Sequence, residues 1–102
     1  MNSKRQKNRD PIKQGHHYAK NHKIVERRMD DTVFLVNPET DTVFYLNQLA
    51  TAIWNICAES ISIKNATHIV QQAFPDVPPK EIARDVYELF KQLSKKDFVA
   101  PC

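Results

Sequence analysis

Two short runs of β-branched and aromatic residues mark the middle of the chain, at residues 32–36 and 42–46. This composition is typical of strands. Between them Pro38 presets φ for the first central position of a turn, and Asn37 suits the position before it. Asp41 is then expected at positive φ, because Asp tolerates that region better than most non-glycine residues. The pattern predicts a β-hairpin.

Apolar residues then recur at helical spacing, which predicts two helices in succession. The first covers about residues 48–58 and begins behind Asn47, a favourable N-cap residue. The second covers about residues 62–74, with Ser62 as its cap.

Pro75, Pro78 and Pro79 interrupt the helical pattern, and Pro79 suits the first turn of a new helix. We expect this third helix to run to about residue 96, because it has the cleanest apolar stripe of the chain. The stripe consists of Ile82, Val86, Leu89, Phe90 and Leu93. Phe98 and Val99 are expected to fold back onto the core.

A further strand is expected at residues 23–28, so three strands precede three helices. This order predicts an α+β fold that is winged helix-turn-helix-like, with a three-stranded antiparallel sheet followed by three helices. The hairpin also leaves residues 42–46 at a sheet edge, and an open edge is a natural seat for an extended peptide.

Charge divides the chain into two parts. Residues 1–28 contain nine Lys/Arg and two Asp/Glu, a net of +7, whereas residues 29–102 contain six and ten, a net of −4. Residues 1–20 have too few apolar side chains to offset the entropy of ordering. We therefore expect a flexible basic arm at residues 1–20 and a folded, mildly acidic domain at residues 21–102.

The candidate chemistry is sparse. The chain has one glycine, no nucleophile–base pair and no paired-carboxylate signature, so neither a phosphate-binding loop nor an enzyme is expected. Its four histidines and two cysteines lack zinc-site spacing, and we expect no metal and no cofactor. Without a secretory signal or an apolar run of about 20 residues, the sequence predicts a cytoplasmic chain that does not associate with a membrane.

The hairpin–helix pattern resembles the PqqD-like family, small peptide-binding modules also called RiPP recognition elements. The resemblance covers roughly residues 23–100. It rests on Asn37-Pro38-Glu39-Thr40, Phe44-Tyr45-Leu46-Asn47, Ala52-Ile53-Trp54, Arg84-Asp85-Val86, Leu89-Phe90 and Leu93. The family commonly has Gly where Asp41 stands here.

This resemblance implies a non-enzymatic chaperone that binds the leader region of a ribosomally made precursor peptide. The leader would add as a strand to residues 42–46, beside the helix at residues 80–96. It would thereby be presented to a modifying enzyme such as a radical-SAM protein, a cyclase or a leader peptidase. The implied peptide-binding residues are Thr42, Val43, Phe44, Tyr45, Leu46, Arg84, Asp85, Glu88 and Leu89.

Three of the aromatic and charged residues have two interpretations. Trp54 is interpreted as the largest core residue rather than a ligand anchor, because its neighbours repeat at helical spacing. Tyr45 fits a half-buried tyrosine and a groove aromatic equally well. Asp85 is either a solvated charge beside Arg84 or a groove residue that fixes the peptide, and the resemblance favours the groove.

The main rival hypothesis is a winged-helix protein that binds nucleic acid through the basic arm. A recognition helix needs cationic and amide side chains directed at phosphates and base edges. The helix at residues 62–74 is polar but contains one Lys, and the third helix mixes both charges, so nucleic acid is the less favoured partner. A structural subunit without a ligand is a third alternative.

Overall fold

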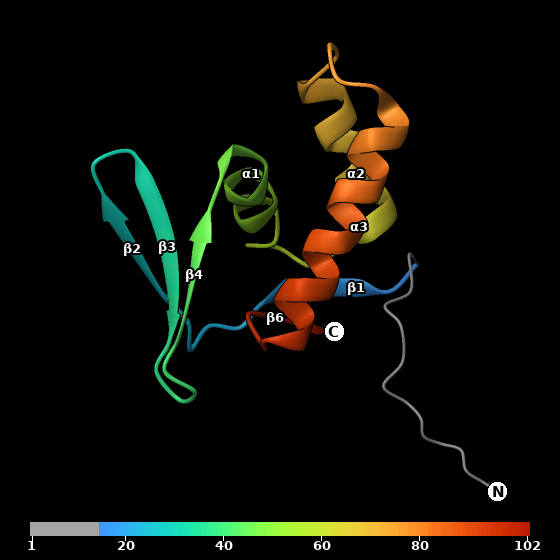
Figure 1. The fold of residues 1–102 in the computed structure, drawn as a ribbon. Coiled ribbons are helices and arrows are strands. Elements are labelled where there is room, and N and C mark those ends of the chain that lie inside the picture. Colours follow the sequence, from blue (N-terminus) through green and yellow to red (C-terminus); the bar gives the residue numbers. More distant parts are fainter. Residues whose placement is uncertain (1–14) are drawn as a thin grey trace, which may run out of the picture.

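The computed structural model describes residues 15–102, which form two small antiparallel sheets and three helices (Figure 1). Residues 1–14, the greater part of the expected arm, lie outside the described residues. In chain order the elements are β1 (His17–Lys20), β2 (Val25–Met29), β3 (Thr32–Asn37), β4 (Thr42–Leu46), α1 (Gln48–Ile56), β5 (Ile61–Ser62), α2 (Ile63–Ala73), α3 (Pro79–Lys95) and β6 (Val99–Pro101). The α+β class with three antiparallel strands followed by three helices is confirmed.

The first sheet has the order β2–β3–β4, and both of its pairings are antiparallel. Phe34 lies opposite Tyr45, and Leu35 lies opposite Phe44. The strand expected at residues 23–28 begins two residues later, because the Ile24 N–H donates to the Asn21 carbonyl in a turn (3.0 Å).

The second sheet, β5–β1–β6, was not predicted. Its central strand β1 lies within the expected arm, yet Tyr18 is only 3% exposed and its ring centroid lies 5.7 Å from that of Phe90. Local sequence patterns do not predict this strand, because its pairing partners, such as Ile61 and Ala100, are distant in the chain. The folded domain therefore begins before the expected boundary at residue 21.

The helices begin where the sequence predicts. The Asn47 side chain accepts a hydrogen bond from the Ala50 N–H (2.8 Å), and the Ser62 hydroxyl accepts one from the Asn65 N–H (3.1 Å). Pro79 opens α3, where its missing N–H costs no intrahelical hydrogen bond.

The core lies between the three helices and the inner face of β3 and β4. The inner faces of α1 and α3 supply many of its side chains, among them Ile53, Val86 and Phe90 at 0% exposure. After α3 the chain reverses at Asp97 (φ 63°), and the Phe98 N–H donates to the Leu93 carbonyl (2.8 Å). Phe98 and Val99 are buried, which confirms that they fold back onto the core.

Candidate functional site

The turn before β4 fixes which side chains the strand presents. The Asn37 side chain accepts a hydrogen bond from the Glu39 N–H (3.0 Å), and Asp41 has φ 58°, as expected. This geometry fixes the register between β3 and β4. Because side chains alternate along a strand, Leu46 enters the core, whereas Val43 and Tyr45 are 46% and 69% exposed on the opposite face.

β4 is an edge strand. Among the described strands it pairs only with β3, so its second edge has no strand partner there. Backbone N–H and C=O groups at such an edge are available to an added strand.

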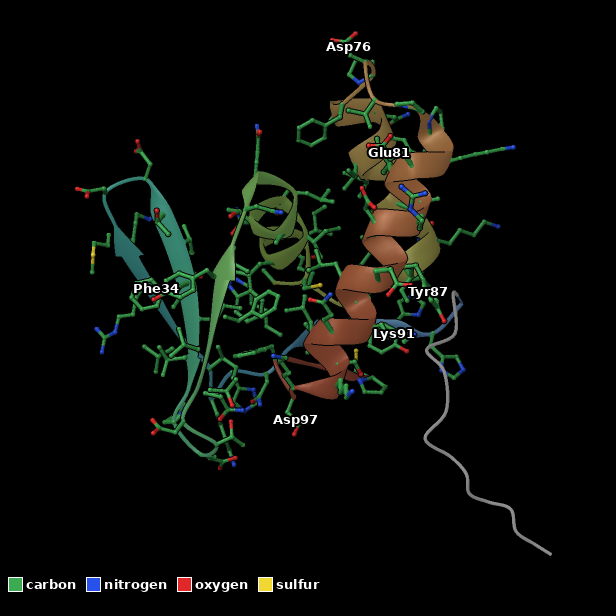
Figure 2. The ribbon with its side chains drawn as sticks, in the orientation of Figure 1. Phe34, Asp76, Glu81, Tyr87, Lys91 and Asp97 are labelled. Carbon is green, nitrogen blue, oxygen red and sulfur yellow. The ribbon has the colours of Figure 1, made fainter. Side chains whose placement is uncertain are left out.

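One face of α3 lies opposite this edge. Asp85, Glu88, Leu89 and Gln92 are spaced by three, four and seven residues, which places them on the same side of the helix. Tyr87 and Lys91 lie on the side of α3 turned away from the first sheet, as Figure 2 shows. The inner stripe of α3, including Val86 and Phe90, is buried and holds this face in position.

A groove of about 500 Å³ lies between β4, the first turn of α1 and α3. It is lined by Phe44, Tyr45, Asn47, Leu49, Ala50, Asp85, Glu88, Leu89 and Gln92. We call this set the β4–α3 groove. Its apolar and polar side chains are interspersed, which suits an amphipathic ligand in extended conformation.

Five of the sequence-predicted site residues line the groove: Phe44, Tyr45, Asp85, Glu88 and Leu89. Four do not line it: Thr42, Val43, Leu46 and Arg84. Thr42 is engaged with Thr40 through their hydroxyl groups (2.8 Å), and Arg84 extends outward with a side chain that is 69% exposed.

Sequence reasoning missed four lining residues. Gln92 stands four positions after Glu88 on the same helix face, so its spacing was a usable signal. The other three missed residues are at the start of α1, which begins directly behind β4: Asn47, Leu49 and Ala50. Their place in the groove depends on how α1 packs against β4, which the sequence does not show.

Tyr45 is not half-buried, as one of its two interpretations required. It is 69% exposed, and its ring centroid lies 5.4 Å from that of Phe34, its neighbour across the sheet. Figure 2 shows Phe34 on the side of the sheet away from the helices. Tyr45 therefore stands at the rim of the groove with its ring accessible.

The groove is electrostatically asymmetric. Asp85 and Glu88 are its two charged lining residues. The Asp85 carboxylate lies 3.6 Å from the Arg84 guanidinium. Just beyond the end of α3, the Lys96 ammonium lies 5.8 Å from the ring centroid of Phe44, a cation–π arrangement next to the groove.

Within residues 15–102 no cluster of three or more His, Cys, Asp or Glu side chains is arranged to hold a metal ion. No helix in that part of the chain is long and apolar enough to cross a membrane. Burial raises the pKa of the Cys57 thiol from 9.0 to about 12, an effect that the nearby Lys20 ammonium opposes and Cys102 reinforces. Cys57 is therefore a neutral core residue at physiological pH, and it is not disulfide-bonded.

The comparisons with known proteins agree with this architecture. The family model for coenzyme PQQ synthesis protein D (PqqD) matches residues 32–99. A solved structure described as TbiB1 in complex with the TbiA(beta) leader peptide is similar in fold, with a TM-score of 0.68 and 21% identity. The alignment covers 79% of this chain and 93% of TbiB1. No curated protein matches, and none of these findings supports a nucleic-acid-binding function.

Proposed function

The chain belongs to the PqqD family, and from this premise we propose that it is a RiPP recognition element that binds the leader region of a ribosomally made precursor peptide. The observation that carries the proposal is the β4–α3 groove beside an open sheet edge. The leader adds as a strand to β4 and directs every second side chain toward the groove.

The binding mode divides the work between backbone and side chains. Main-chain hydrogen bonds along the edge of β4 supply affinity for any extended segment. Selectivity comes from the groove, where Phe44 and Leu89 offer apolar contact and Asn47 and Gln92 offer polar contact. TbiB1, which shares the fold, has a leader peptide bound in its solved structure, and this likeness supports the proposal.

The protein acts as a carrier and performs no chemistry itself. It presents the bound precursor to a cytoplasmic modifying enzyme, which is a radical-SAM protein, a cyclase or a leader peptidase. Four of the sequence-predicted site residues do not line the groove. Thr42, Val43 and Leu46 belong to the strand to which the leader adds, and Arg84 lies outside the groove beside Asp85.

An NMR titration tests the function directly. Leader peptides encoded beside this gene are added to the isotope-labelled full chain, and at least one is expected to bind with micromolar or tighter affinity. Backbone shift changes should concentrate in residues 42–47 and 80–93. Shifts confined to α2, or no response to any of these leaders, would count decisively against the proposal.

A further inference from the structure

The β4–α3 groove has two charged side chains, and both are acidic. Asp85 and Glu88 are three residues apart on α3 and line the groove together. The other lining side chains are apolar or uncharged. The α3 wall is therefore anionic where it faces the edge of β4.

Both carboxylates are available to a ligand. The partner of Asp85 is Arg84, whose side chain is 69% exposed and lies outside the groove. An exposed pair of this kind contributes little free energy, so Asp85 can exchange Arg84 for a basic side chain of a ligand. Glu88 takes part in none of the ion pairs found within residues 15–102.

A cation lies just beyond the lining residues, next to Phe44. Lys96, just beyond the end of α3, places its ammonium 5.8 Å from the ring centroid of Phe44. β4 and α3 run in opposite directions, as the colours in Figure 1 show. The acidic pair therefore lies toward the end of β4, near Asn47, and Lys96 lies toward its beginning.

We infer that the groove selects an extended peptide with a basic side chain followed, four positions later, by an acidic side chain, with an apolar side chain midway between them. The inference rests on the proposed strand addition to β4. It adds the chemistry of the peptide and its direction.

The direction follows from the sheet. Both pairings in β2–β3–β4 are antiparallel, and antiparallel pairing is slightly more stable per residue than parallel pairing. An antiparallel peptide begins beside Leu46 and ends beside Thr42. Its earlier residues then meet the acidic pair, and its later residues meet Lys96.

The spacing follows from the dimensions of helix and strand. The eight positions from Glu88 to Lys96 correspond to about 12 Å along a helix axis. A strand rises about 3.3 Å per residue, so about four peptide residues cover the same distance. Because four is even, the basic and acidic side chains share the face that meets the groove, and the residue midway between them does as well.

A peptide-display selection tests this pattern even before a leader peptide has been identified. A library of random peptides is selected on the immobilised full chain, on Asp85→Asn/Glu88→Gln, and on Glu81→Gln as the matched control. Glu81 is an acidic residue on the same helix but does not line the groove. The native chain and Glu81→Gln should both enrich the basic–apolar–acidic order, and the double variant should lose the basic preference.

Two synthetic peptides of identical composition then measure the effect. One has Lys, Leu and Glu at alternate positions in the inferred order, and the other has Lys and Glu exchanged. In the first peptide, Lys meets the acidic pair and Glu meets Lys96, so two partly exposed ion pairs form. In the second peptide, like charges face each other at both places. The first peptide should therefore bind about tenfold more tightly at low salt. Raising the salt concentration should narrow the difference, because these charges are screened.

The outcomes separate the inference from the function on which it rests. Equal affinity of the two peptides, or preference for the reversed order, overturns the charge order while strand addition to β4 stands. Selection of no extended peptide at all overturns both. Loss of the preference in Glu81→Gln would also contradict the inference, because it would locate the selectivity outside the groove.

Discussion

Trp54 joins strand β2 to helix α1 through its indole N–H. It is 2% exposed, and Nε1 donates to Oε1 of Glu26 at 2.8 Å. The Lys20 ammonium lies 4.6 Å from the ring centroid and 4.0 Å from the same carboxylate oxygen. The interpretation of Trp54 as a core residue is confirmed, and its polar atom is satisfied by a strand distant in sequence.

Replacing Glu26 with alanine should destabilise the fold. The change leaves the buried indole N–H without its acceptor, which typically costs about 1–3 kcal/mol. Glu39→Ala is the matched control, because Glu39 pairs with Lys23 at 3.2 Å where both side chains are more than half exposed. Its loss should cost well under about 1 kcal/mol. Urea unfolding measures both variants, and equal losses would contradict this role of Glu26.

Because of Cys57, the free energy of unfolding should depend on pH in the alkaline range. Burial raises its pKa from 9.0 to about 12 in the folded chain. Above pH 9 the unfolded chain releases the thiol proton while the folded chain retains it. The stabilisation is therefore complete below pH 9 and is lost as the pH rises toward 12.

The expected result is a fall in the melting temperature across this window that is shallower in Cys57→Ala. Other groups titrate in both proteins, so the measurement is the difference between the two pH profiles. If the melting temperatures of the two proteins fall in parallel with pH, Cys57 is not the source of the pH dependence. In the native state a thiol reagent should label the exposed Cys102 quickly and Cys57 only on unfolding.

At the scale of elements, local signals located the hairpin and the helix starts. Asn37, Asp41, Asn47 and Ser62 each act through neighbours within three residues, so their roles were visible in the sequence. β1 was not visible, because its pairing depends on residues distant in the chain. The sequence therefore predicted elements that depend on local contacts, but it did not predict strands whose pairing is non-local.

The groove was only partly predictable for the same reason. Helical spacing brings Asp85, Glu88 and Leu89 together, and strand alternation separates Tyr45 from Leu46. The contribution of α1 depends on how that helix packs behind β4, which no sequence period encodes. The prediction treated strand 42–46 as a unit and so included Val43, which lies outside the groove.

Tyr45→Ala tests the contribution of β4 to leader binding. Tyr45 lines the groove at its rim, and loss of an aromatic anchor at an interface commonly costs on the order of 2 kcal/mol, about thirtyfold in affinity. Val43→Ala is the control, since Val43 is exposed on the same strand face but does not line the groove.

Calorimetry with a leader identified by the NMR titration should show weaker binding for Tyr45→Ala and near-native binding for Val43→Ala. Both variants should melt close to the native temperature, because both side chains are already exposed. Similar affinities for the two variants would argue against Tyr45 as an anchor.

At the scale of the whole molecule, β1, near the beginning of the described chain, pairs with one strand from its middle and one from its end. It lies between β5 and β6, and Tyr18 packs against Phe90 of α3. The helix that forms one wall of the groove is thus braced by residues that the sequence analysis placed in the arm.

Two truncations test where the domain begins. Removing residues 1–14 should leave the melting temperature and leader affinity near native values. Removing residues 1–20 also deletes β1 and the buried Tyr18, and losing a buried aromatic side chain alone typically costs about 3–5 kcal/mol. The longer truncation should therefore have a much lower melting temperature, which circular dichroism measures. Equal stability of the two truncations would restore the boundary at residue 21.

The central position of β1 has a consequence for synthesis on the ribosome. Its residues emerge long before residues 99–101, with which they pair, so the second sheet cannot close until those later residues have left the exit tunnel. Closure across so long a loop is entropically costly and slow relative to local hairpin formation. The β2–β3–β4 hairpins can assemble earlier, whereas the bracing of α3 by β1 and β6 must wait until residues 99–101 have left the exit tunnel. A released chain that lacks residues 99–101 should therefore bind a leader peptide poorly, even though it contains every lining residue of the groove.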